Sequence, residues 1–134
     1  MKHLRVVLIA FVLVVTSCNS AKKESVVPGT WSVSSVSFSG GDMSLELMNA
    51  IRELGMSVQY TFNTDSTYTM RSSISTHAGF GRWSYIEDTE LLIMTPNGEQ
   101  PMRTKLSIKS ENNLVLQIEN KGTLLDYKLT RKSK

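Results

Sequence analysis

The fold is decided by residues 58–70, which read Val58-Gln59-Tyr60-Thr61-Phe62-Asn63-Thr64-Asp65-Ser66-Thr67-Tyr68-Thr69-Met70. Apolar and polar residues alternate on both sides of a polar cluster at 63–66. A period of two is the signature of strands with one buried face. Asn, Asp and Ser in the cluster favour a tight turn. This stretch therefore predicts two antiparallel strands joined by a turn.

The same alternation recurs along most of the chain and gives eight candidate strands between Trp31 and Leu129. In the first strand the phase slips at Ser34-Ser35, which predicts a β-bulge. Most connections are short, about two to six residues, so consecutive strands are expected to pair in order. The sequence predicts a mainly-β chain, an eight-stranded up-and-down antiparallel barrel. Such a closed barrel has no exposed edges and can hold side chains or one small ligand.

One segment departs from this pattern and predicts a helix from Asp42 to Leu54, between the first and second strands. Its apolar residues fall at helical spacing on one stripe: Leu47, Met48, Ile51 and Leu54. Asp42 or Ser44 can cap its start and Gly55 can end it. We expect this helix to pack over one mouth of the barrel, as a structural element rather than a moving lid.

The N-terminus has the three parts of an export signal: basic Lys2 and Arg5, the apolar run 6–15, and small residues before Cys18. The apolar run is shorter than the roughly 20 residues of a transmembrane helix. Val-Thr-Ser-Cys at 15–18 resembles the lipobox of bacterial lipoproteins. That resemblance implies cleavage before Cys18, acylation of Cys18 and a membrane anchor. The expected organisation is a signal at 1–17, the lipidated cysteine and a tether at 18–28, and the barrel at 29–134.

Composition excludes several classes of function. The chain has 15 Lys and Arg against 12 Asp and Glu, and Lys2 and Arg5 would leave with the signal. The processed chain is therefore nearly neutral, and a nucleic-acid partner has no electrostatic basis. Cys18 is the single cysteine, so no disulfide supports the domain.

Catalytic motifs are missing from the sequence as well. His77 is the only histidine after processing, and it lies in a predicted loop. Cys-His catalysis and a Cys/His zinc cluster are therefore ruled out, and there is no nucleophile elbow or phosphate loop. We expect no enzymatic activity, no metal site and no cofactor.

Several short motifs carry a resemblance to a known family: Gly29-Thr30-Trp31, the 60–68 strand-turn-strand, Gly81-Arg82-Trp83-Ser84-Tyr85 and Leu114-Val115-Leu116. In this order the chain resembles the lipocalin-like lipoproteins of the Bacteroidetes group over roughly residues 28–132. The resemblance implies a lipid-anchored envelope protein with a lipocalin-like barrel. It also implies that Trp31 closes the barrel base and that Arg131, or second Lys128, packs across the indole. The chain differs from the secreted lipocalins in having no disulfides and in having a helix after the first strand.

The interior phases of the strands carry aromatic and methionine side chains that can line a ligand cavity. Candidate lining residues are Tyr60, Phe62, Met70, Trp83 and Met102. Two readings stay open. In one, the protein binds a small apolar ligand in the barrel. In the other, the core is packed and ligand-free, and the protein is an interaction or structural module that binds another envelope protein, for which the serine-rich first strand offers an accessible face.

The residues after Cys18 bear on location by resemblance alone. Asn19 does not match the aspartate of inner-membrane retention, and Lys22-Lys23 does not match an acidic surface-export signal. The expected location is the outer membrane, facing the periplasm.

Overall fold

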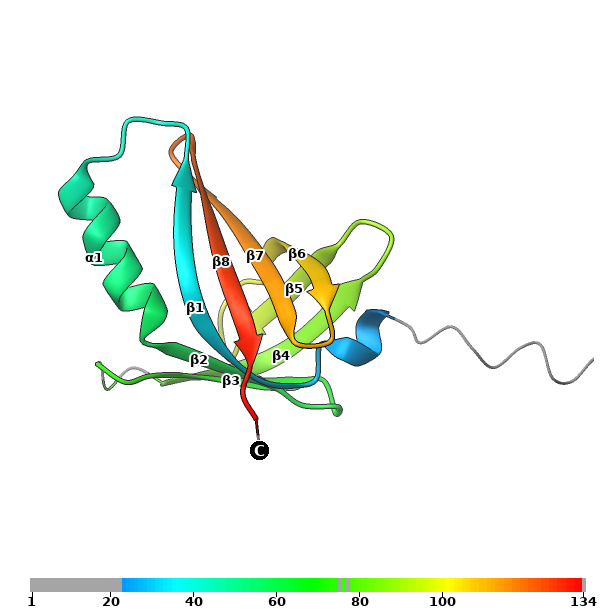
Figure 1. Ribbon diagram of the computed structural model, residues 1–134. Coiled ribbons are helices and arrows are strands. Elements are labelled where there is room, and N and C mark those ends of the chain that lie inside the picture. The colour runs from blue at the N-terminus through cyan, green and yellow to red at the C-terminus, as the bar shows by residue number, and fades with distance from the viewer. Residues whose placement is uncertain (1–22, 75, 77, 134) are drawn as a thin grey trace, which may run out of the picture.

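The computed structural model describes residues 23–74, 76 and 78–133. A short 3-10 turn, η1, leads into eight strands and one helix (Figure 1). The elements are η1 (Lys23–Val26), β1 (Gly29–Ser39), α1 (Leu45–Met56), β2 (Val58–Phe62), β3 (Thr67–Ser72), β4 (Ala78–Ile86), β5 (Leu91–Pro96), β6 (Met102–Ser110), β7 (Asn113–Asn120) and β8 (Thr123–Arg131). The predicted class, a mainly-β chain with one helix between the first two strands, is confirmed.

The strands pair in chain order, and β8 returns to β1, so the sheet is a closed antiparallel barrel. The predicted bulge is confirmed, because the β1–β8 register shifts between Val33 and Ser35. The buried apolar residues of the described chain lie between Val27 and Leu129. Residues 23–133 therefore contain the whole barrel and its core, and a chain of residues 19–134 retains both.

The helix begins and ends later than the sequence predicts. Its bounds are Leu45–Met56 rather than 42–54, with Ser44 as the N-cap, whose hydroxyl accepts from the Leu47 amide at 3.2 Å. Gly55 does not end the helix but lies inside it. A Cβ at this position would lie 2.8 Å from Cε1 of Tyr127 and 3.2 Å from Cγ2 of Val36. The glycine is therefore used for close packing rather than for termination.

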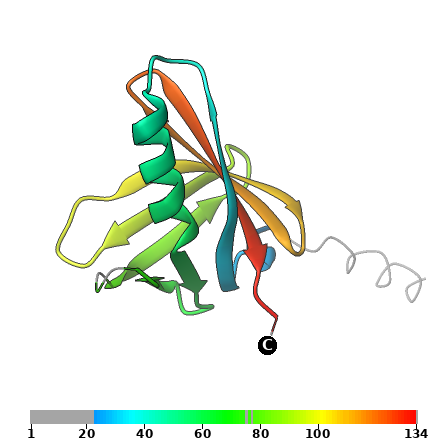
Figure 2. The ribbon, with the colours of Figure 1, turned by 60° about the vertical axis from the view of Figure 1, so that its left-hand side comes forward.

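The barrel is closed at one end and splayed at the other. The pairs between β1 and β2 run only from Gly29–Phe62 to Ser32–Gln59, whereas β1 pairs with β8 as far as Ser39. The far half of β1 therefore rises beyond β2 together with β7 and β8, and α1 lies beside it (Figures 1 and 2). In the described part of the chain, no helix has the length and apolarity needed to cross a bilayer.

Candidate functional site

The closed end of the barrel is built around Trp31, whose side chain is fully buried. Its Nε1 donates to the carbonyl oxygen of Val27 at 2.8 Å. The guanidinium carbon of Arg131 lies 4.3 Å from the centre of the indole ring. The Arg131 guanidinium also donates to the carbonyl oxygens of Pro28 at 2.8 Å, Val26 at 2.6 Å and Glu111 at 2.9 Å. One arginine thus fastens the N-terminal segment and the β6–β7 turn across the base.

The glycine of the Gly-Thr-Trp motif is required because there is no space for a side chain at this position. Gly29 has a φ of +139°, and a Cβ there would collide with Nη1 of Arg131. A side chain at this position would therefore displace the guanidinium from the indole. The motif and the arginine, 102 positions apart in the numbering, form one structural unit.

Two of the candidate ligand residues, Phe62 and Trp83, lie in the packed core. Phe62 is 2% exposed and Trp83 is 7% exposed, and their rings meet edge to face at 5.6 Å. Nε1 of Trp83 donates to the carbonyl oxygen of Asn63 at 3.0 Å. Both side chains are therefore packed within the barrel, and neither lines the pocket described below.

The helix occupies the gap left where β2 separates from β1. Gly55 packs on Tyr127 and Val36, and the guanidinium of Arg52 lies 5.3 Å from the ring centre of Phe38. Nε of Arg52 donates to the Val36 carbonyl oxygen at 3.4 Å. Part of the unpaired edge of β1 is thereby covered.

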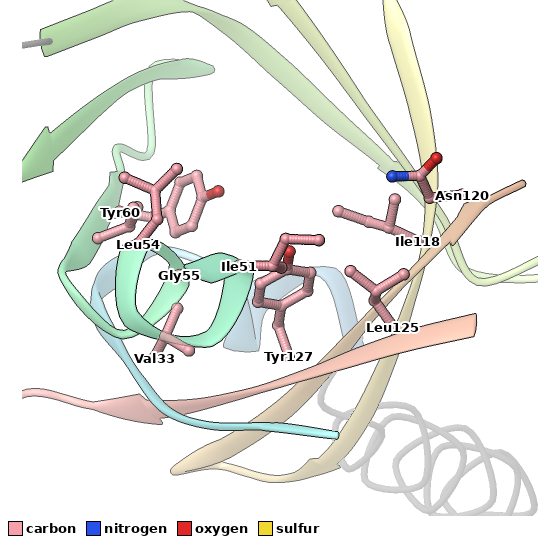
Figure 3. A pocket seen from close by; sticks show the side chains of 10 residues that line it. Val33, Ile51, Leu54, Gly55, Tyr60, Ile118, Asn120, Leu125 and Tyr127 are labelled. Atoms are coloured by element: carbon pink, nitrogen blue, oxygen red, sulfur yellow. The ribbon is translucent and has the colours of Figure 1, made fainter. Parts of the chain in front are cut away.

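A pocket of about 290 Å³ lies between α1 and the splayed strands (Figure 3). It is open to solvent and is lined by Val33, Ile51, Leu54, Gly55, Val58, Tyr60, Ile118, Asn120, Leu125 and Tyr127. The helix supplies one wall, and β1, β2, β7 and β8 supply the rest. Tyr60 enters from one side, and Ile118 and Asn120 lie across from it (Figure 3). This volume is near the lower limit of ordinary small-molecule sites.

The pocket lining carries no charged side chain. Its polar groups are the hydroxyls of Tyr60 and Tyr127 and the carboxamide of Asn120. Burial, with smaller effects from Tyr127 and Tyr68, raises the pKa of Tyr60 to about 12. Burial also raises the pKa of Tyr127. Both phenols are therefore neutral hydrogen-bond donors at physiological pH.

A larger basin, of about 600 Å³, adjoins the pocket at the tip of the β7–β8 hairpin. It is lined by Gly41, Asp42, Met43, Ser44, Leu47, Asn120, Lys121 and Thr123. Asn120 lines both the pocket and the basin. Leu47 and Leu54, on the pocket side of α1, are 48% and 54% exposed. An apolar stripe on a helix usually indicates a face that is buried in the core. Here the stripe forms the wall of an open groove instead.

The structure does not bring the five candidate ligand residues together around one cavity. Tyr60 lines the pocket, while Phe62 and Trp83 lie in the packed core. Met70 is half-buried on β3, and its terminal methyl lies near Gly79. Met102 begins β6 and is 48% exposed. Neither methionine belongs to the described pocket lining.

Sequence reasoning missed most of the lining, namely Val33, Val58, Ile118, Asn120, Leu125 and Tyr127, and it assigned Ile51 and Leu54 to a structural helix. A signal existed in the alternation, because the inward phases of the first and last strands carry Val33, Leu125 and Tyr127. What it did not indicate is which inward residues lie beyond the packed layer.

No group of three or more His, Cys, Asp or Glu side chains that could hold a metal occurs in the described residues. Cys18 and His77 lie outside those residues, as do the predicted signal and the first part of the tether. The acidic residues 87, 88 and 90 lie in the turn between β4 and β5.

Fold and pocket together define a small closed β-barrel with an open, mostly apolar pocket beside helix α1. No family model matches the chain, and no curated protein matches it. Among solved structures, it is similar to a DUF4847 family protein from Bacteroides vulgatus ATCC 8482 determined at 1.00 Å resolution. The identity is 19%, the TM-score is 0.50, and the match covers 81% of this chain and 95% of the other. At this identity the likeness shows a shared fold alone.

Proposed function

We propose that the protein binds a small apolar molecule in the pocket between α1 and the splayed strands β1, β7 and β8. One observation carries the proposal: a solvent-open pocket of about 290 Å³ whose wall is mostly apolar and holds no charged side chain. Water in such a pocket finds few hydrogen-bond partners, so an apolar ligand is favoured to replace it. The exposed Leu47 and Leu54 extend the apolar wall outward to the basin.

A fluorescent apolar probe, N-phenyl-1-naphthylamine, tests this function on a chain of residues 19–134. We expect saturable binding that Ile51→Trp weakens at least tenfold, because the indole would fill the space beside Tyr127. The matched control is Leu45→Trp, the same substitution on another face of the same helix, where the side chain is 69% exposed. The control should bind the probe within twofold of the natural chain. Equal binding by the Ile51 variant would place the probe elsewhere and contradict the proposal.

The pocket is proposed to act in the bacterial envelope, at the end of a lipid anchor. This part rests on the sequence, in which Cys18 follows an export signal and resembles a lipobox cysteine. The outer membrane facing the periplasm is the proposed location. We further propose that the protein binds and presents its ligand without catalysis.

A second candidate function is a protein-interaction module of the envelope. It is favoured by two exposed apolar side chains of α1 that do not line the pocket, Leu45 at 69% and Met56 at 48%. Exposed apolar groups that share a face mark interaction sites when they form a patch. Crosslinking in intact cells, with Leu45→Ser compared against Ile51→Ser, separates the two functions. Loss of a crosslinked partner only in the Leu45 variant would favour the interaction module.

A further inference from the structure

The hydroxyls of Tyr60 and Tyr127 both point toward the middle of the pocket (Figure 3). Within residues 23–74, 76 and 78–133, neither hydroxyl has a hydrogen-bond partner. The side-chain polar atom that is both buried and unpartnered in that part of the chain is Oγ1 of Thr104, not a phenol oxygen. The two hydroxyls therefore reach the open space of the pocket and are free to donate to its occupant.

Three buried aromatic side chains donate to backbone carbonyl oxygens: Trp31 to Val27 at 2.8 Å, Trp83 to Asn63 at 3.0 Å, and Tyr85 to Leu106 at 3.0 Å. This is the usual state of buried polar groups. Among the described residues, the hydroxyls of Tyr60, Tyr68 and Tyr127 have no such partner, and of these three tyrosines Tyr60 and Tyr127 line the pocket. An unpaired donor in a mostly apolar wall favours a ligand that carries an acceptor.

The same wall disfavours a charged occupant. No lysine, arginine or histidine lines the pocket, so a buried carboxylate or phosphate would have no counter-ion. Burying an unpaired charge is far more costly than burying a neutral acceptor. Charged side chains line the two neighbouring hollows instead: Asp42 and Lys121 in the basin that shares Asn120, and Arg103, Lys105 and Glu119 in the hollow that shares Ile118. The two phenols remain neutral donors, because burial raises their pKa values.

We propose that the pocket selects an uncharged molecule with an apolar body and one acceptor oxygen, of the ketone, ester or ether class, to which Tyr60 and Tyr127 donate. This inference rests on the proposed function and narrows it. Apolar contact with Ile51, Leu54 and Leu125 supplies most of the affinity, and the phenols supply the selectivity.

Three probes of similar size and shape separate the apolar contribution to affinity from that of the phenol hydrogen bonds. Of these, 4-phenylbutan-2-one carries the acceptor, isopentylbenzene lacks it, and 3-phenylpropanoate is charged at pH 7. Their dissociation constants are measured by amide chemical shifts of the ¹⁵N-labelled chain of residues 19–134. A hydrogen bond of about 1 kcal/mol corresponds to roughly fivefold in affinity. We expect Tyr60→Phe to weaken the ketone by about 3- to 10-fold and to leave the hydrocarbon within twofold. The carboxylate should bind the natural chain at least tenfold more weakly than the ketone.

Tyr127→Phe provides a second test should the first variant fold poorly. Tyr85→Phe is the matched control, because it removes a phenol hydroxyl that is bonded inside the core at 3.0 Å. It should change the affinity for the ketone less than twofold. If the hydrocarbon binds but neither pocket variant weakens the ketone, or if the carboxylate binds as tightly, the inference is overturned and the proposed function stands. If none of the three probes binds, both are overturned.

Discussion

Replacing Arg131 by methionine should remove the fastening of the barrel base while keeping the bulk of the side chain. Methionine loses the cation–π contact with Trp31, made at 4.3 Å and worth about 0.5–2 kcal/mol. It also loses charged hydrogen bonds to the carbonyl oxygens of Val26 and Pro28, which are partly buried. Such bonds contribute about 1.5–3 kcal/mol each when water cannot replace them. Since water can reach part of this site, we expect a total loss of about 3 kcal/mol.

Urea unfolding, followed by tryptophan fluorescence, measures this loss as a fall in the free energy of unfolding. The matched control is Lys128→Met, also on β8, at an exposed position. This control should change the free energy of unfolding by less than about 0.5 kcal/mol. Arg131→Lys should fall between the two, because an ammonium keeps the charge but not the planar fork.

The reasoning would be refuted by a loss in Arg131→Met no larger than that in Lys128→Met. Hydrogen exchange gives an independent check of the cause. The amides of residues 23–27 should lose protection in Arg131→Met, because the carbonyl groups of Val26 and Pro28 no longer hold this segment across the base. Unchanged protection there would show that the segment is fixed by other contacts.

Three further predictions follow from other parts of the chain. Gly55→Ala should lower the free energy of unfolding by about 1 kcal/mol or more in urea, despite the better helix propensity of alanine, because the new Cβ would lie 2.8 Å from Tyr127; a gain in stability would contradict the packing argument. Cys18→Ala should abolish acyl labelling and release the protein from membranes, and continued labelling would disprove the lipobox interpretation. The folded-state pKa of Tyr60, about 12, lies above its ordinary value of 10.0. The contribution of the neutral Tyr60 phenol to the free energy of unfolding is therefore complete below pH 10 and is lost as pH rises toward 12. Stability should fall by about 2 kcal/mol over that interval, and Tyr60→Phe should remove most of that fall.

Local periodicity was sufficient to predict the strands, the bulge at Ser34-Ser35 and the place of the helix. Each of these follows from neighbours within a few residues, because a strand alternates with a period of two and an extra residue shifts the phase. The pairing order followed from short connections. The contact between Trp31 and Arg131 could be anticipated only through the family resemblance, because no local pattern joins residues so far apart.

The pocket was much less predictable, and the reason is geometric. Tyr60 and Phe62 share one strand, one face and one phase, yet Phe62 is packed in the core and Tyr60 lines the pocket. Alternation reports the face of a strand but not the depth along the barrel axis. That depth depends on where β2 leaves β1 and on how Gly55 seats the helix. Both are contacts between distant segments, so a stripe such as Leu47-Ile51-Leu54 looks the same whether it is covered or open.

The early separation of β2 from β1, after the Ser32–Gln59 pair, gives the molecule two ends that can change independently. The packed rings of Phe62, Tyr68 and Trp83 and the base around Trp31 hold the sheet together at one end, below the point of separation. The segment 40–57 forms a wall only above that point. Segment 40–57 could therefore be replaced by a different helical segment to change the ligand that the barrel binds. The packed end of the barrel, which keeps the protein folded, would stay unchanged.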